Sequence, residues 1–204
     1  GLEWPGEDAQ AIFEYEDREV FNERQGQPTS IDLVVDAKDG CSGLYIEAKF
    51  TEHEFGGCSL FQSGDCDGRN PSNDLDLCYL HHIGRKYWSL IHKYGLQKGS
   101  IGTDAGCILS NHYQFFRELL FALEKGGTFV LLSDDRNPVF YSSGPQGERG
   151  LMPFLTELLP TDIQKRVALI SIQELIAEIH ASEEHTWAVE FMDKYGISVS
   201  EDTV

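Results

Sequence analysis

The segment that most constrains the fold runs from Ser30 to Phe50, SIDLVVDAKDGCSGLYIEAKF. Two runs in which apolar residues recur at every second position, Ile31 to Val35 and Leu44 to Phe50, flank the stretch DAKDGCSG. The pair Asp39-Gly40 within that stretch is a strong signal for a two-residue hairpin loop, because aspartate and glycine tolerate the positive φ angles of such turns. The sequence therefore predicts two antiparallel strands joined by a tight turn.

A turn at Asp39-Gly40 also fixes the register of the two strands. It places Asp32 opposite Glu47, Val34 opposite Tyr45, Leu33 opposite Ile46 and Val35 opposite Leu44. One face of the hairpin is then aliphatic and is expected to pack on a core, whereas the other face collects Asp32, Asp36, Glu47 and Lys49. Directly opposed side chains lie about 5 Å apart at Cβ, a separation that a bound divalent cation spans. The alternative is a solvated polar face with a cross-strand ion pair.

These residues resemble the catalytic motif of the PD-(D/E)xK nucleases, the restriction-endonuclease-like superfamily. That motif has an aspartate on one strand and, on the next antiparallel strand, an acidic residue, any residue and a lysine. Asp32 matches the first part, and Glu47-Ala48-Lys49 matches the second. The proline of the motif is not adjacent in this chain, since Ile31 precedes Asp32 and the nearest proline is Pro28.

The resemblance implies a core that runs helix, three strands, helix, strand. The opening AIFEYEDREVF is compatible with a helix or a strand, and we interpret it as a strand. NHYQFFRELLFALEKGG predicts a helix from Asn111 to Lys125, and TFVLLSD predicts a buried strand from Thr128 to Ser133. This helix would return the chain parallel to an earlier strand. The first helix of the family core would be the ambiguous opening or would lie upstream.

The predicted fold class is α/β, a restriction-endonuclease-like core with a mixed central sheet flanked by helices. We expect one domain over residues 1–204, with a cysteine-containing insertion at approximately 51–110. Further helices are predicted over Asn73 to Gly95, interrupted by Gly84, over Met152 to Leu159 and over Glu184 to Tyr195. RVALISIQELIAEIH predicts a strand that runs directly into a helix.

The resemblance also implies a metal-dependent nuclease. Asp32, Glu47 and the backbone carbonyl of Ala48 would hold Mg²⁺ or Mn²⁺, because these hard cations prefer oxygen ligands. Lys49 would orient the attacking water or stabilise negative charge in the transition state. Gln114 resembles a glutamine that supports the active site in some members of the superfamily, although Glu118 stands where an aromatic residue would follow. Glu14 is a weaker candidate for a further metal ligand.

The charge of the chain argues against a surface that coats nucleic acid by itself. It has 34 acidic and 16 basic side chains and a formal net charge of -18, whereas phosphate binding normally uses clustered lysine and arginine. The basic residues available to one side of a cleft are Arg24, Lys38, Arg85, Lys86 and Arg117. An upstream segment or a partner subunit would supply further basic surface, and a homo-oligomer is compatible with the sequence. The alternative function is a catalytically inactive scaffold that acts as a protein-interaction module.

Four of the five cysteines, Cys58, Cys66, Cys78 and Cys107, fall inside the predicted insertion. Their grouping suggests one structural metal site, holding Zn²⁺ or an iron-sulfur cluster. Their spacings of eight, twelve and twenty-nine residues contain no Cys-x-x-Cys pair and match no standard zinc pattern. The alternative is four small buried thiols in a loop-rich region.

The chain has no run of apolar residues long enough to span a membrane and no signal-peptide pattern at Gly1. The odd number of cysteines also disfavours a disulfide scaffold. We therefore expect a cytoplasmic protein. The resemblance to the PD-(D/E)xK nucleases further implies a nuclease that acts on DNA, in prokaryotic restriction, defence or DNA processing.

Overall fold

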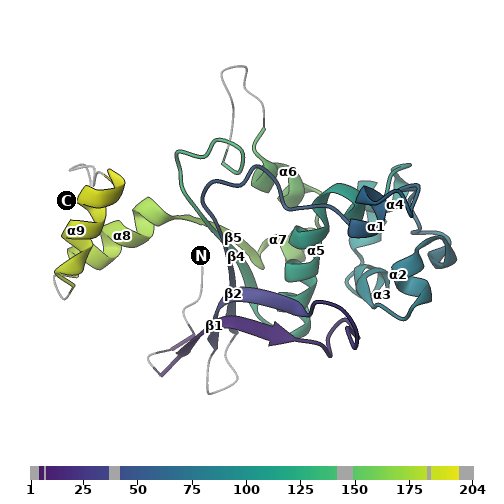
Figure 1. Ribbon diagram of the computed structural model, residues 1–204, viewed down its shortest axis with the longest axis horizontal. Coiled ribbons are helices and arrows are strands. Elements are labelled where there is room, and N and C mark those ends of the chain that lie inside the picture. Colours follow the sequence, from purple (N-terminus) through teal and green to yellow (C-terminus); the bar gives the residue numbers. More distant parts are fainter. Residues whose placement is uncertain (1–4, 7, 37–41, 142–148, 183–184, 198–204) are drawn as a thin grey trace.

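The fold is built on a five-stranded mixed sheet with the strands in the order β1-β2-β3-β4-β5 (Figure 1). The computed structural model describes residues 5–6, 8–36, 42–141, 149–182 and 185–197. β1 (Gln10–Asp17), β2 (Thr29–Asp36) and β3 (Leu44–Lys49) are antiparallel neighbours. β4 (Thr128–Ser133) is parallel to β3, and β5 (Val167–Ser171) is parallel to β4. Helices flank this sheet, as the α/β class predicted from the sequence requires.

The register predicted for the hairpin is confirmed where β2 and β3 pair. Leu33 lies opposite Ile46, Val34 opposite Tyr45 and Val35 opposite Leu44. The predicted turn at Asp39-Gly40 lies outside the described residues. The strand interpretation of the opening segment is also confirmed, because β1 pairs with β2 along most of its length.

The crossover predicted between β3 and β4 is present. Its last element is α5 (Leu109–Glu124), which leads into β4 and so brings it parallel to β3. The helix begins slightly before the predicted Asn111 and is kinked at His112, whose φ of -129° and ψ of 33° are not helical. The N–H groups of Tyr113 and Gln114 consequently bond the carbonyls of Gly56 and Phe55, at 3.0 and 3.1 Å.

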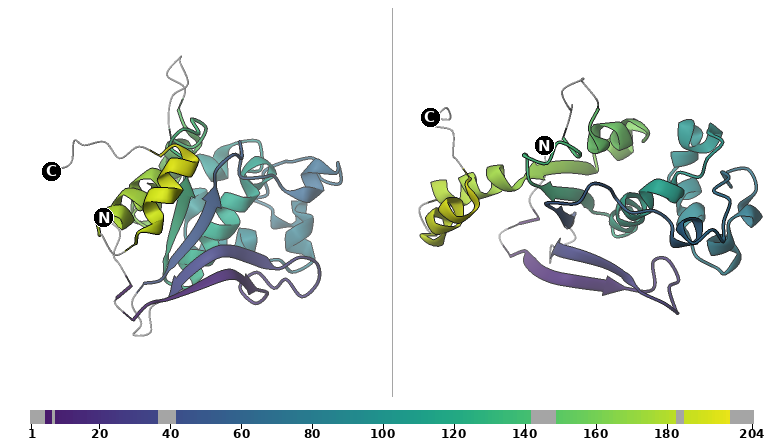
Figure 2. Two further views of the ribbon diagram at one scale, coloured as in Figure 1. Left: turned by 60° about the vertical axis from the view of Figure 1, so that its left-hand side comes forward. Right: turned by 45° about the horizontal axis from the view of Figure 1, so that its top comes forward.

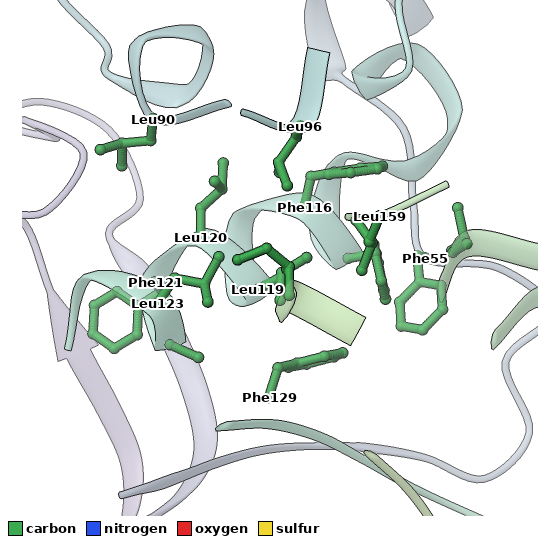
Figure 3. Close-up of a cluster of buried hydrophobic side chains, with 14 of the residues drawn as sticks. Phe55, Leu90, Leu96, Phe116, Leu119, Leu120, Phe121, Leu123, Phe129 and Leu159 are labelled. Atoms are coloured by element: carbon green, nitrogen blue, oxygen red, sulfur yellow. The ribbon is translucent and has the colours of Figure 1, made fainter. Parts of the chain in front are cut away.

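The main hydrophobic core lies between α5 and the sheet (Figure 3). α5 buries apolar side chains at helical spacing, which is why this segment forms an amphipathic helix rather than a loop. The ring of Phe121 packs edge-on against Tyr45 of β3, with ring centroids 5.5 Å apart, and Phe115 packs against Phe129 of β4 at 5.6 Å. α6 (Leu151–Glu157) and α7 (Thr161–Gln164) add Met152, Leu155 and Ile163 to the same core.

Both faces of the β2–β3 hairpin pack on hydrophobic clusters, whereas the sequence predicted a core under the aliphatic face only. Val34 and Tyr45, which share a face with Glu47 and Lys49, belong to the main core under α5. The aliphatic face packs on a smaller cluster, formed by Val35, Leu44 and Val130 with Leu33, Ile46, Ala168, Ile170 and Ala9 around it. The charged residues of β3 are therefore not on a solvated face, and the alternative of a polar outer face is wrong for them.

The segment between β3 and α5 consists of short helices that gather beside one end of α5 (Figures 1 and 2). They are α1 (Ser59–Gln62), η1 (Leu75–Leu77), α2 (Tyr79–His82), α3 (Tyr87–Lys93), η2 (Leu96–Lys98) and α4 (Ser100–Thr103). The interruption predicted at Gly84 is confirmed, because the chain breaks there between α2 and α3 and Gly84 has a φ of +86°. The part before Gly84 is less regular than predicted, since it divides into η1 and α2. Gly95, with a φ of +67°, does end α3 as predicted.

The C-terminal elements agree closely with the sequence patterns. α6 covers most of the predicted helix from Met152 to Leu159. β5 runs into α8 (Ile172–Ala181), which begins with a capping box in which Ser171 and Glu174 bond each other's backbone N–H groups. α9 (Trp187–Tyr195) forms most of the last predicted helix, whose expected start at Glu184 lies outside the described residues. α8 and α9 extend away from the sheet (Figure 2).

Candidate active site

Asp32 marks the point at which the pairing of β2 and β3 changes. The backbone pairs of these two strands end at Leu33 and Ile46, and beyond them the backbone N–H of Ala48 donates to Asp32 Oδ2 at 2.8 Å. The aspartate side chain thus takes the place of a backbone acceptor and is held beside β3. This contact brings Asp32 next to the Glu47-Ala48-Lys49 segment, as the predicted register requires.

Glu47 is the centre of this group of side chains. Its side chain is almost fully buried, with 6% of the residue exposed. Gln114 Nε2, on the first regular turn of α5, donates to Glu47 Oε1, and Lys49 Nζ lies 3.3 Å from the same oxygen. Lys49 is also 6% exposed. The structure therefore brings together four residues that the sequence singled out: Asp32, Glu47, Lys49 and Gln114.

The electrostatics of the group favour a cation. Burial, followed by the charge of Asp32, raises the pKa of the Glu47 carboxyl to about 7, whereas Lys49 and Arg117 act in the opposite direction. A carboxylate that is desolvated beside a second carboxylate is destabilised, and a positive charge between the two relieves this. Solvent reaches the group from the side of Asp32, Ala48 and Gln114, which are half-buried.

Two further residues of α5 belong to this group. The sequence interpretation gave Glu118 no role in the site and placed Arg117 among the basic residues available to one side of a cleft. Glu118 is fully buried, and burial followed by the charge of Glu47 raises the pKa of its carboxyl well above the usual value. Arg117 Nη2 lies 3.9 Å from Glu118 Oε1, and its guanidinium lies 5.5 Å from the centre of the Tyr113 ring. Glu118 follows Gln114 by four residues, so helical spacing alone places both on one face of α5.

A comparison with protein-family models identifies the family of this chain. Residues 1–196 match the model of a family described as restriction endonuclease associating with ARP. The chain belongs to this family. Comparisons with curated proteins and with solved structures gave no match. Membership of a restriction-endonuclease family supports the restriction-endonuclease-like identity of the mixed sheet and a nuclease-like function.

Several other residues that the sequence indicated for the site lie away from Asp32 and Glu47. Glu14 is exposed on the edge strand β1, at a φ of +50°, and β2 separates this strand from β3. Asp36 is exposed at the end of β2. Arg85 donates to the carbonyls of Asn22 and Gln25, and Lys86 to that of Glu19, so both hold the β1–β2 connection instead of lining a cleft. Lys38 lies outside the described residues.

The residues at this site offer carboxylate and carbonyl oxygens to a metal ion. In the described part of the chain, no three His, Cys, Asp or Glu side chains are grouped so that they could hold an ion by themselves. Asp32 and Glu47 supply two carboxylates, and Ala48 between Glu47 and Lys49 supplies a carbonyl. Mg²⁺ commonly uses one or two carboxylates and completes its shell with waters and substrate phosphate. The residues present fit an ion of this kind, and they do not form a closed cage.

A small cavity among the short helices between β3 and α5 is lined by four free thiols, those of Cys58, Cys66, Cys78 and Cys107.

No helix within the described ranges has both the length and the apolar character needed to cross a bilayer.

Proposed function

We propose that the protein is a metal-dependent nuclease that hydrolyses phosphodiester bonds in DNA. The observation that supports this most is the meeting of Asp32, Glu47, Lys49 and Gln114 at the carboxyl end of β3. Sites in α/β sheets typically lie at this end of the strands. The arrangement of an aspartate opposite a Glu-x-Lys strand is the one that the resemblance to the PD-(D/E)xK nucleases implies.

In this proposal each residue has a separate task. Asp32, Glu47 and the Ala48 carbonyl hold Mg²⁺ or Mn²⁺. The bound ion would neutralise charge on the scissile phosphate and make the attacking water more acidic. Lys49 stabilises the negative charge that develops on the phosphoryl oxygens or orients the water. Gln114 fixes the orientation of the Glu47 carboxylate through its hydrogen bond.

The family description names association with ARP, and we extend this to a partner of this chain. A net charge of -18 opposes DNA binding by the isolated protein. A partner with basic surface would offset that charge beside the site. The same acidic charge favours the second candidate function, an inactive scaffold that binds a protein partner through its surface.

Plasmid cleavage tests the catalytic proposal. The wild-type protein, alone and with its partner, is incubated with supercoiled plasmid and Mg²⁺ or Mn²⁺. Lys49→Ala and Glu47→Gln should abolish nicking and linearisation. Lys165→Ala is the matched control, because Lys165 is exposed and lies outside the site. Equal cleavage by Lys49→Ala and the wild type would contradict the proposal, and partner binding without any cleavage would support the scaffold.

A further inference from the structure

Four cysteines that are far apart in sequence meet around one cavity. Cys58, Cys66, Cys78 and Cys107 all line a cavity of about 20 Å³. Its other walls are apolar side chains, including Leu60, Phe61 and Leu109, together with backbone. All four thiols are unpaired by disulfides. The fold therefore gathers the four cysteines even though their spacing in sequence shows no recognisable metal-binding pattern.

The cysteines come from four different short segments. Cys58 directly precedes α1, and Cys66 lies in the loop after it. Cys78 lies between η1 and α2, and Cys107 lies two residues before α5. Several of the helices here have only three or four residues, too few to be stable by themselves. A bond network among the cysteines would join these segments to each other and to α5.

Backbone N–H groups are directed at three of the four sulfur atoms. The N–H of Gly68 donates to Cys66 Sγ at 3.4 Å. The backbone N–H groups of Leu80 and His81 favour negative charge on the Cys78 sulfur, and those of Leu109 and Ser110 favour it on the Cys107 sulfur. In each case the donors follow the cysteine by two or three residues. Such donors stabilise negative charge on sulfur and are the second shell expected around metal-bound thiolates.

Burial disfavours the thiolate form of two of the four cysteines, Cys78 and Cys107. Burial raises the pKa of the Cys107 thiol to about 11, while the N–H groups of Leu109 and Ser110 oppose this. Burial likewise raises the pKa of Cys78. The geometric observation that groups these sulfur atoms is the single cavity that all four cysteines line.

We propose that Cys58, Cys66, Cys78 and Cys107 form a structural site for one tetrahedral thiophilic divalent ion, of which Zn²⁺ is the natural occupant. Four cysteine thiolates are a common structural ligand set for zinc. The size of the cavity favours a single ion, because about 10–15 Å³ already holds one water molecule and a multi-atom cluster needs more. Since no described group yet has the spacing of a formed metal site, the sulfur atoms must draw together when the ion binds.

The site would anchor α5. Cys107 precedes the kink at His112, and Gln114 lies directly beyond that kink. An ion on Cys107 would therefore fix the N-terminal end of the helix that carries Gln114 and Glu118. The inference does not depend on the proposed nuclease activity, because it concerns the folding of the segment between β3 and α5.

The test uses the full chain without a histidine tag. Untagged protein, purified without chelators, is analysed by elemental mass spectrometry, and we expect one zinc per chain. The protein is then loaded with Co²⁺, which in a tetrathiolate site gives the visible bands of tetrahedral cobalt and sulfur-to-cobalt charge transfer. Native and denatured protein are titrated with a thiol reagent, and we expect four thiols to be protected by the metal until a chelator is added.

Matched variants assign the ligands. Single Cys→Ser changes at positions 58, 66, 78 and 107 should each lose the stoichiometric zinc and the charge-transfer band. Cys41→Ser should keep both. Asp32→Asn should also keep the zinc, which separates this site from the carboxylates. If a ligand variant does not fold, the cobalt spectrum and thiol protection of the wild type still decide. Absence of both signals, or iron with acid-labile sulfide in place of zinc, would overturn the proposal.

Discussion

Gln114 on α5 donates a hydrogen bond to the carboxylate of Glu47 on β3, which lies 67 residues earlier in the chain. This contact couples the crossover helix to the strand that carries Glu47 and Lys49. Its donor comes from the first regular turn of α5, after the kink at His112. The orientation of the Glu47 carboxylate consequently depends on the position of a helix as well as on the sheet.

Gln114→Ala should lower plasmid cleavage by about 10–100-fold, the usual cost of removing a group that orients a metal ligand. Because Glu47 would still bind the ion, activity should be reduced without being abolished. The measurement is the initial rate of nicking at several Mn²⁺ concentrations, compared with Gln27→Ala as an exposed control. A Gln114→Ala rate equal to that of the control would show that the hydrogen bond has no catalytic role.

Mn²⁺ should raise the melting temperature of the wild-type protein, because an ion that binds only the folded state stabilises it by mass action. At a concentration 100 times the dissociation constant, the stabilisation is about 2.7 kcal/mol. Asp32→Asn should lose most of this shift, whereas Asp8→Asn, at an exposed position, should keep it. Differential scanning calorimetry with and without Mn²⁺ provides the measurement. An unchanged shift in Asp32→Asn would place the ion elsewhere.

Tyr87→Phe should lower the free energy of unfolding by about 1–3 kcal/mol. The Tyr87 hydroxyl donates to the buried Glu23 and accepts from Tyr113, and Glu23 also binds the backbone N–H and the hydroxyl of Thr29. Removing the hydroxyl leaves Glu23 Oε1 without this donor. Urea denaturation measures the effect, with Tyr79→Phe as a control because Tyr79 is 55% exposed. Equal midpoints for the two variants would contradict this role.

Asp134→Asn should lower the free energy of unfolding by about 1 kcal/mol or less at pH 7, since the contact is partly solvated. The side chain of Arg136, above other causes, holds the pKa of the Asp134 carboxyl below its usual range. A carboxylate with a lowered pKa contributes its full stabilisation above its ordinary pKa of about 4. This contribution is lost as the pH falls through the lower value of the folded protein.

The difference between wild type and Asp134→Asn should therefore stay constant from pH 7 to about pH 5 and shrink below about pH 4. Denaturation curves across this range measure it. Arg136 also donates to the carbonyl of Tyr195 at the end of α9, so proteolysis of α8 and α9 provides a second readout. A difference that grows on acidification would show that the lowered pKa of Asp134 does not govern this contact.

Much of the fold follows from local patterns in the sequence. The alternation around Ile31 and Leu44 and the predicted turn were sufficient to give the β2–β3 register. The helical periodicity of α5, followed by two glycines and a β-branched and apolar run, gave the crossover and β4. These elements are predictable because their buried faces have a clear period, and the turn type fixes their alignment.

The structural features that could not be predicted from the sequence depend on long-range packing. Nothing local shows that the face bearing Glu47 lies under α5, since this depends on which side of the sheet the helix crosses. The interruption at Gly84 was visible in the sequence, but the division of the preceding residues into η1 and α2 was not. Glu118 was recognisable by its spacing from Gln114, but its full burial beside Glu47 was visible only in three dimensions.

The central place of β3 in the sheet has a consequence for how the protein responds to heat. β3 is hydrogen-bonded to β2 on one side and to β4 on the other. On the side of β3 that pairs with β4, the backbone amides of Glu47 and Lys49 can exchange with deuterated solvent only when the sheet itself opens, so they should be among the slowest-exchanging amides of the chain. Inactivation on warming should then coincide with global unfolding, without an earlier phase of local melting around the two side chains.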